Sequence, residues 1–538
     1  MSTAGDPPRV ARPEEAGVRA DAGMPIGMPV ELDPDTRQIA DDVLFGGSPA
    51  RVLRLSAAGR RALAELRAGP VTSAAGATLA RRLADTGMAH PRPGQSVPGA
   101  AAAVLDAPVL DATVVVPVRD RARELNRCLA AAGTGYPVVV VDDGSADAAA
   151  VAAVCAAHGA RLLRRSVNGG PGPARNTALG VVSTRFVAFL DSDCIPPPGW
   201  IDALAGHFAD PLVAAVAPRV VGIAAGPAGA AGAADAAAAA GGSPLDLGDR
   251  PARVAPLTRV AYVPTAALVV RRAAIGAGFD EALRYGEDVD LVWRLIEAGW
   301  RVRYEPDVRV AHTEPASRSA LLRRRFRYGN SAAPLTRRHP GAVAPLVLQP
   351  WPTITMAALL ARRPLTAGSA FGVSTVLLAR RLGANGLPAQ GLARPMAGGV
   401  WQTWLGTGRW CGQFAAPALL LVLARPGGRR ARTRWGRRLA AASLLVGPPL
   451  VQWGQRRDGT PLRFTVETLA DQAAYGAGVY AGCLRERLVT PVLPSVSWQP
   501  FEGLRRRRAA RQPARGPDRR LGHQRGDFSV HTTEKSPR

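Results

Sequence analysis

Short runs of consecutive apolar residues recur through the middle of the chain, and each run ends in polar or acidic residues. The runs at residues 113–118, 137–141 and 186–190 are rich in β-branched and aromatic residues and are too short for helices, which predicts buried parallel strands. Segments with apolar residues at helical spacing lie between the strands. The pattern predicts an α/β domain that presents its polar residues at the carboxyl edge of a sheet.

Pairs of carboxylates follow two of these strands. Asp142 and Asp143 come after the second strand, and Asp191 and Asp193 flank Ser192 after residues 186–190. Burying an unpaired carboxylate is costly, so these groups need a cation or solvent. Mg²⁺ and Mn²⁺ bind carboxylates and complete their shells with phosphate oxygens. Although Asp-x-Asp is also typical of a solvated turn, its position after a buried strand favours a metal–diphosphate site.

Composition excludes several classes of chemistry. The 538-residue chain has five cysteines without a CxxC pair, which argues against structural zinc and disulfides and favours a reducing cytoplasm. Its only lysine is Lys535, so the rest of the chain has no Walker lysine and no Schiff-base amine. The net charge is +26, but arginine, alanine, glycine and proline are enriched throughout. We therefore interpret the charge as a compositional bias and expect no nucleic-acid partner.

The N-terminal part predicts a disordered leader followed by a small module. Residues 1–28 are polar and rich in proline and glycine, without the pattern of a signal peptide. Residues 29–98 contain short apolar strands and then helices, the first beginning at Ser56 as N-cap. The segment Val52-Leu53-Arg54-Leu55-Ser56 resembles small winged-helix-like modules that bind precursor peptides. A purely structural cap on the following domain is the alternative.

The C-terminal part is predicted to be helical. Residues 319–500 alternate apolar stretches with arginine clusters, and no apolar stretch reaches the ~20 residues of a comfortable membrane span. We expect this region to contact a membrane surface, with true spanning helices as the rival interpretation. Residues 501–538 are predicted to be a disordered basic tail.

Four segments together carry a family resemblance. VVVPVRDR at 114–121, VVDDGS at 140–145, GGPGPARN at 169–176 and FLDSDC at 189–194 occur in this order. They resemble the nucleotide-sugar half of the family 2 glycosyltransferases of GT-A fold, placing that domain at residues 110–318. The resemblance implies a mixed α/β sheet, a UDP-sugar donor and a divalent metal, Mn²⁺ or Mg²⁺.

The resemblance also implies roles for individual residues. Asp143 would contact the uracil, Pro117 to Arg119 would line the base pocket, and Arg175 would approach the diphosphate. Asp191 and Asp193 would hold the metal and the ribose. The predicted nucleotide-sugar-binding residues are Pro117, Arg119, Asp142, Asp143, Arg175, Asp191 and Ser192. Carboxylates and guanidinium groups suit these tasks because they bind imide N–H groups and phosphates, respectively.

A second acidic centre lies at residues 285–294. Glu287 and Asp288 stand near the start of a predicted helix, where the helix dipole favours acidic residues, so a capping role is one explanation. The resemblance instead implies that this pair is catalytic, with Asp288 as the general base of an inverting transfer. His312 matches a position that in some family members completes the metal shell, beside Asp191 and Asp193.

The order of the parts is similar to that in glycosyltransferases of the mycofactocin pathway. This narrower resemblance implies transfer of a hexose, with glucose as the expected sugar, from a UDP-sugar to a peptide-derived redox cofactor precursor, with an oligosaccharide as one product. A membrane glycosyltransferase of cell-envelope polysaccharide or glycolipid synthesis is the alternative. A non-enzymatic arginine-rich binding protein is a further rival. The expected location is the cytoplasmic side of the membrane, peripheral or integral, and otherwise the cytoplasm.

Overall fold

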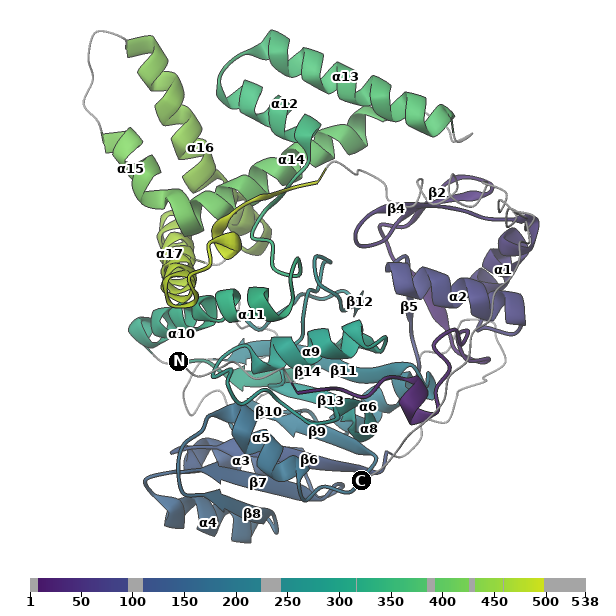
Figure 1. Ribbon diagram of the computed structural model, residues 1–538, viewed down its shortest axis with the longest axis vertical. Helices are drawn as coiled ribbons and strands as arrows, with labels where there is room; N and C mark the ends of the chain where they lie inside the picture. The colour runs from purple at the N-terminus through teal and green to yellow at the C-terminus, as the bar shows by residue number, and fades with distance from the viewer. Residues whose placement is uncertain are drawn as a thin grey trace, which may run out of the picture.

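The computed structural model describes residues 8–94, 110–223, 243–315, 317–384, 392–424, 431–457 and 459–497. Figure 1 shows a small N-terminal module, a central sheet domain and a helical C-terminal region, which lies above the sheet domain in this view. The helical character predicted for the C-terminal region is confirmed. The predicted basic tail, residues 501–538, lies outside the described residues.

The N-terminal module combines short antiparallel strands with a helix pair. Strands β2 (Arg37–Ala40), β3 (Val43–Gly46) and β4 (Arg51–Arg54) form one sheet, and β1 (Val30–Leu32) pairs with β5 (Ala89–Pro91). Helices α1 (Ala57–Ala68) and α2 (Ala74–Thr86) pack beside them. Ser56 accepts a hydrogen bond from the Gly59 amide, which confirms it as the N-cap of α1.

Residues 8–28 differ from the predicted disordered leader, because they follow a defined path over the rest of the chain. The Pro8 carbonyl accepts a hydrogen bond from Arg294, and the Ala11 carbonyl accepts one from the Trp300 indole, each at 2.7 Å. Met24 and Met28 are buried in the core of the module. A leader of low average hydrophobicity is thus held by a few buried side chains and by its own backbone carbonyls.

The central domain has a nine-stranded mixed sheet in the order β10-β14-β11-β13-β9-β6-β7-β8, with β12 paired to β14. The strands β8, β7, β6 and β9 are parallel, whereas β13 is antiparallel to both neighbours. This is the mixed α/β sheet predicted for a GT-A fold. The strands are β6 (Ala112–Val118), β7 (Val138–Asp143), β8 (Arg161–Arg165), β9 (Phe186–Leu190), β10 (Cys194–Ile195), β11 (Val213–Ile223), β12 (Ala252–Arg253), β13 (Ala267–Arg271) and β14 (Arg301–Thr313).

Alternating residues of the central strands belong to two hydrophobic cores, one on each face of the sheet. On β6, Val115 faces one core, whereas Val114 and Val116 face the other. The first core contains side chains of α5 (Pro171–Leu179), α8 (Arg272–Ile275) and α9 (Glu287–Glu297). The second contains side chains of α3 (Ala122–Ala132), α4 (Ala148–Ala157) and α6 (Trp200–Ala205). Both faces of the sheet are therefore covered, as the continuous apolar runs predicted.

One predicted strand is shorter in the structure. The apolar segment 260–272 predicts a single strand, but only Ala267–Arg271 forms a strand, β13, while Val260 makes an isolated bridge with Val254. Pro264 lacks an amide donor for a ladder, and the Ala261 carbonyl instead accepts a hydrogen bond from the Trp293 indole. Residues 260–266 are consequently an irregular segment that contacts α9 through Trp293.

The C-terminal region is built from helices, and its first and last helices pack closely together. Helix α10 (Arg318–Asn330) lies against α17 (Pro461–Glu486), and a Cβ on Gly478 would come within 2.0 Å of the Phe326 carbonyl. The other helices are α11 (Ala332–Arg338), α12 (Pro350–Leu360), α13 (Pro364–Gly383), α14 (Ala393–Trp410), α15 (Ala416–Ala424) and α16 (Ala431–Arg456). Among the described residues, no helix has both the length and the apolarity for a membrane crossing.

Candidate active site

The loops that follow β6 and β7 are joined at the carboxyl edge of the sheet. The Asp120 amide donates to the Ser145 hydroxyl at 2.9 Å, and Asp120 accepts from the Ala146 amide at 2.7 Å. Arg119 is half exposed beside Asp120, and Pro117 is partly buried within β6. The strand ends predicted to meet at one edge do meet there.

Asp142 and Asp143 are both buried, and both accept several hydrogen bonds. Asp142 accepts hydrogen bonds from the Ser145 amide and from Arg164. Asp143 accepts from Arg165 and from the amides of Gly169 and Gly170, at 2.9, 3.0 and 2.6 Å. Asp143 therefore ties the glycine-rich loop to β7 in this structure. Contact with uracil stays a prediction.

Arg175, the residue predicted to approach the diphosphate, is buried in this structure, and contact with the diphosphate stays a prediction. Its side chain is only 2% exposed. One guanidinium nitrogen donates to Asp191 at 2.7 Å and the other to Glu287 at 2.9 Å. Arg175 also lies over the Phe279 ring, 5.4 Å from its centre. The residue thus links the strand-end motif to the acidic helix start, an arrangement that sequence order alone does not reveal.

The three predicted metal ligands do not converge. His312 Nε2 lies 3.5 Å from Asp193 Oδ1, whereas Asp191 is turned toward Arg175. No three His, Cys, Asp or Glu side chains form a ready-made metal site within the described part of the chain. A carboxylate beside an imidazole still suits Mn²⁺, with the remaining positions taken by diphosphate oxygens. The pair Asp193 and His312 therefore fits a metal held jointly with the donor.

Further charged groups orient this pair. Arg121 is paired with Asp193, and Glu314 Oε1 lies 3.3 Å from His312 Nδ1. Burial would lower the pKa of His312, but Glu314 and Asp193 outweigh burial and raise it. Burial would raise the pKa of Glu314, but its hydrogen bonds and the nearby cations lower that pKa to about 2. Glu314 is thus an anion placed against the His312 ring.

Glu287 and Asp288 start α9 as predicted, and their environments differ. Glu287 is buried, and burial together with the neighbouring Asp288 carboxylate raises its pKa to about 7. Asp288 is partly exposed; burial raises its pKa, although the Arg175 cation opposes the shift. Of the two, Asp288 is the carboxylate that a substrate can reach. A raised pKa suits a carboxylate that must take up a proton near neutral pH.

Two tyrosines from distant segments, Tyr262 and Tyr328, lie close enough to Asp288 for its charge to act on them. The Asp288 carboxylate, after burial, raises the pKa of Tyr262, to about 12, and contributes to the raised pKa of Tyr328. Tyr475 of α17 stands nearby, with Arg325 stacked 5.3 Å from its ring centre. A signal was present in the aromatic residues interleaved with arginines at 323–328. Tyr262, Tyr328 and Tyr475 are together called the aromatic wall, and α10 and α17 contribute the last two of them.

Family models match two overlapping parts of the chain. Residues 113–243 match the glycosyl transferase family 2, and residues 186–423 match the glycosyl transferase family group 2. The first match contains the four segments at the sheet edge. The second extends from β9 into α15 of the helical region.

Curated relatives and solved structures differ in their sequence identity to the chain and in how much of it they cover. The "Pre-mycofactocin glycosyltransferase" of Mycobacterium tuberculosis is 39% identical over 495 residues, covering 88% of this chain and 98% of the relative. The "Succinoglycan biosynthesis protein ExoO" of Rhizobium meliloti is 31% identical over 237 residues, covering 40% of this chain and 64% of the relative. A mannosyltransferase from Pyrobaculum calidifontis, solved with GDP-Man and Mn²⁺, has 19% identity and a TM-score of 0.34, covering 63% and 87% of the two chains.

The family matches fall on the segments that build the sheet edge and the acidic helix start, and the most extensive of these similarities runs through all three parts of the chain. The chain is therefore an enzyme that belongs to the family 2 glycosyltransferases.

Proposed function

We propose that this enzyme transfers a hexosyl group, glucose in the first instance, from a UDP-sugar to a peptide-derived redox cofactor precursor of mycofactocin biosynthesis. The similarity to the pre-mycofactocin glycosyltransferase supports the pathway, because it covers nearly the whole length of both chains. Addition of further units to the first sugar would give an oligosaccharide.

The placement of Asp288 carries the proposed chemistry. It is partly exposed, its pKa is raised, and Arg175 connects its neighbour Glu287 to Asp191 of the donor motif. The proposed base is therefore the sequence neighbour of a carboxylate that Arg175 links by hydrogen bonds to the expected donor site. This arrangement suits a direct displacement with a single base, and we propose that the transfer inverts the anomeric carbon.

In the proposed reaction, Asp288 accepts the proton of an acceptor hydroxyl as its oxygen bonds to C1 of the sugar. The bond between C1 and the diphosphate oxygen breaks on the opposite face, and UDP leaves with the bonding electrons. Asp193 and His312 would hold a divalent metal, Mn²⁺ or Mg²⁺, which supplies charge neutralisation for the diphosphate. Asp143 and the segment Pro117 to Arg119 are proposed to bind the uracil, and Ser192 and Asp191 the ribose side of the donor.

The acceptor is proposed to lie between Asp288 and the aromatic wall. Tyr262, Tyr328 and Tyr475 come from the sheet domain, α10 and α17, respectively. Aromatic rings stack on planar or sugar-like groups at a low cost in conformational entropy. The N-terminal module, residues 29–98, is proposed to hold the peptide part of the acceptor or its precursor, with a structural cap as the alternative role.

The proposal is tested by UDP release from UDP-glucose with and without the peptide-derived acceptor, in the presence of Mn²⁺ or Mg²⁺. We expect release that depends on the acceptor, and a fall of roughly 10²- to 10⁴-fold for Asp288→Asn. The matched control is Asp249→Asn, an exposed aspartate away from the site, which should keep full activity. UDP release that does not depend on the acceptor would overturn the proposed acceptor. Full activity of Asp288→Asn would overturn the assignment of Asp288 as the base.

The similarity to the succinoglycan biosynthesis protein favours a second candidate function, synthesis of a cell-envelope polysaccharide or glycolipid. The catalytic residues would be the same, and only the acceptor would differ. Transfer to a lipid-linked or glycan acceptor, with none to the peptide-derived compound, would select this function.

A further inference from the structure

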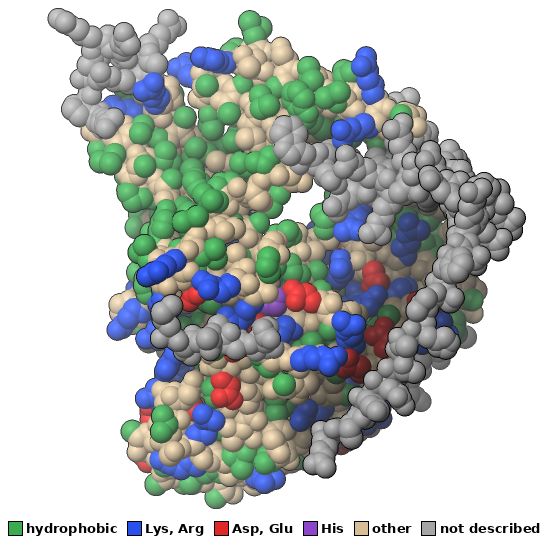
Figure 2. Space-filling view, in the orientation of Figure 1, with side chains coloured by type: hydrophobic (Ala, Val, Ile, Leu, Met, Phe, Trp, Pro, Cys, Tyr) green, Lys and Arg blue, Asp and Glu red, His purple; other side chains and the backbone are tan. Residues whose placement is uncertain are grey.

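The helical region carries an unusual distribution of charge. No Asp, Glu or Lys lies between Glu314 and Asp458, whereas arginine recurs throughout this stretch. Figure 2 shows hydrophobic and basic side chains, and no acidic ones, over the upper part of the face on view, where α12 to α16 lie. A surface of this composition repels cations and other basic surfaces, and it attracts a partner that is anionic and extended.

Part of this surface forms a compact patch, here called the basic tip. It joins the turn between α12 and α13 to the start of α16. Helix α12 lies against α16, and Arg362 Cδ lies 3.3 Å from the position that a Cβ would take on Gly436. The basic tip consists of Leu359, Arg362, Arg363, Leu365, Trp435 and Leu439.

The apolar members of the basic tip are unusually exposed. Leu365 is 87% exposed and Trp435 is 60% exposed, while Leu359 and Leu439 are exposed by more than half. Among the described residues, neither Arg362 nor Arg363 pairs with a carboxylate. Exposed leucine and tryptophan beside unpaired arginine is the combination that binds an anionic bilayer, because the apolar groups enter the interface while the cations meet the headgroups.

We propose that the basic tip docks this enzyme onto the anionic cytoplasmic leaflet of a membrane, with Leu365 and Trp435 inserted at the interface. Nucleic acid is also anionic, but it offers no apolar phase for Leu365, Leu359 and Leu439. The proposal goes beyond glycosyl transfer, since it concerns the location of the enzyme, and it stands or falls independently of the acceptor.

The test uses the full-length protein and sedimentation with vesicles. One set is pure phosphatidylcholine, and the other contains equal parts of phosphatidylcholine and phosphatidylglycerol. We expect binding only to the anionic vesicles and weaker binding as salt rises. The double variant Arg362→Gln/Arg363→Gln should bind about tenfold more weakly, since each basic residue near such a surface contributes to the attraction.

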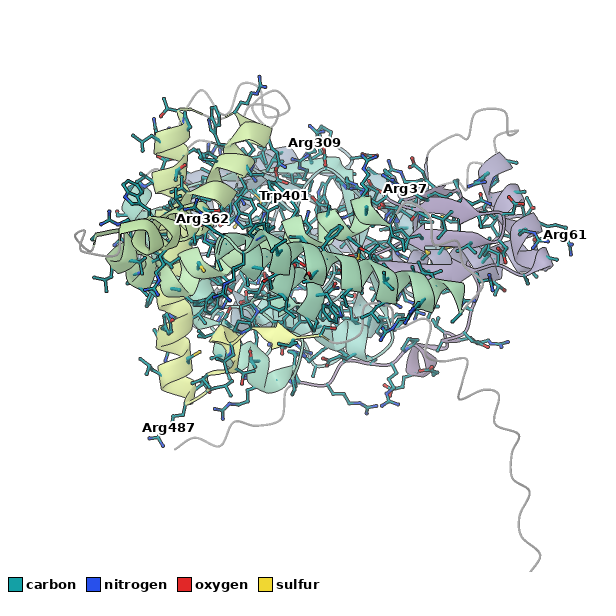
Figure 3. The ribbon with its side chains drawn as sticks, turned by 90° about the horizontal axis from the view of Figure 1, so that it is seen from above. Arg37, Arg61, Arg309, Arg362, Trp401 and Arg487 are labelled. Atoms are coloured by element: carbon teal, nitrogen blue, oxygen red, sulfur yellow. The ribbon has the colours of Figure 1, made fainter. Side chains whose placement is uncertain are left out.

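A matched control removes the same charge elsewhere. Arg60 and Arg61 are an exposed adjacent pair on α1, and Figure 3 shows Arg61 at the far end of the N-terminal module from Arg362. Arg60→Gln/Arg61→Gln should leave vesicle binding within about twofold of the parent. Equal losses for the two double variants, or equal binding to neutral and anionic vesicles, would overturn the proposal.

A second measurement tests insertion and separates a bilayer from other polyanions. Leu365→Ser/Trp435→Ser should reduce binding at salt concentrations that screen the arginines. The conservative variant Trp435→Phe should keep binding but lose part of the fluorescence quenching by brominated lipid. Unchanged quenching in Trp435→Phe, or release from vesicles by duplex DNA with no effect of the apolar variants, would mean that the surface binds polyanions without inserting, and the proposal would fail.

Discussion

Arg175 donates a 2.9 Å hydrogen bond to Glu287, and both side chains are buried. The second nitrogen of the same guanidinium bonds Asp191, so a single cation lies between the donor motif and the acidic start of α9. Burial makes this interaction strong and makes its loss expensive, because two carboxylates would be left without their cation.

Removal of this cation should change the pH dependence of the reaction. Arg175 opposes the raised pKa of both Glu287 and Asp288, so Arg175→Gln should raise these pKa values further. The base acts only when deprotonated, and the rate falls as pH drops through its pKa. The acid limb of the profile of kcat/KM against pH should therefore move to higher pH in the variant.

The same experiment distinguishes a positioning role from a merely structural one. Arg175→Lys keeps the charge but loses the two-pronged geometry, so its acid limb should stay nearer to that of the parent while kcat falls. An unshifted limb in Arg175→Gln would contradict the assignment of Asp288 as the titrating base.

The position of Glu314 beside His312 predicts a change in metal requirement. Glu314 is 3.3 Å from His312 Nδ1 and also accepts from Ser243 at 2.6 Å. Replacing residues that orient metal ligands commonly weakens metal affinity by about 10- to 100-fold. Glu314→Gln should therefore raise the Mn²⁺ concentration for half-maximal UDP release by about tenfold, with activity restored by excess metal. A lower maximal rate at an unchanged metal requirement would contradict this role.

The aromatic wall predicts separate effects on donor and acceptor. Tyr328→Leu should raise the acceptor KM by roughly three- to tenfold, because a ring available for stacking is lost. The donor KM should rise less, since Asp288 acts on Tyr328 more strongly than Asp191 of the donor motif does. Tyr328→Phe keeps the ring and should behave like the parent. Equal increases in both KM values would place Tyr328 elsewhere in the site.

The N-terminal module is attached through a buried ion pair whose loss should destabilise the protein. Arg81 of α2 donates to both oxygens of Asp210 in the sheet domain, at 2.6 and 2.7 Å, and both side chains are buried. Breaking a buried pair by removing one partner costs about 3–5 kcal/mol, so Arg81→Met should lower the urea midpoint clearly. The exposed pair Arg19 and Asp21 provides the control, and Arg19→Met should leave the midpoint unchanged. Equal midpoints for the two variants would show that the module is held by other contacts.

The strands and the shared sheet edge were predictable because each strand is marked locally by an apolar run that ends in polar residues. The start of α9 at Glu287 was predictable because the helix dipole favours acidic residues in a first turn. The partners of the acidic residues were not predictable from the sequence. Asp290 reads as a helix-start acid, yet it is fully buried between Arg294 and His339. Arg175 and Glu287 are 112 positions apart, and such pairings depend on tertiary packing that no local pattern records.

The close contact of α10 with α17 positions the aromatic wall, and two glycines allow it to be tested. A Cβ on Gly478 would lie 2.0 Å from the Phe326 carbonyl, whereas one on Gly372 of α13 would meet nothing within 4 Å. Gly478→Ala should push the helices apart, lower the midpoint of thermal unfolding and raise the acceptor KM through the displaced Tyr475 and Tyr328. Gly372→Ala makes the same chemical change in an open helical position and should stabilise by roughly 0.5–1 kcal/mol, because alanine loses less backbone entropy than glycine. Similar behaviour of the two variants in thermal unfolding and in acceptor KM would show that the α10–α17 contact does not shape the acceptor site.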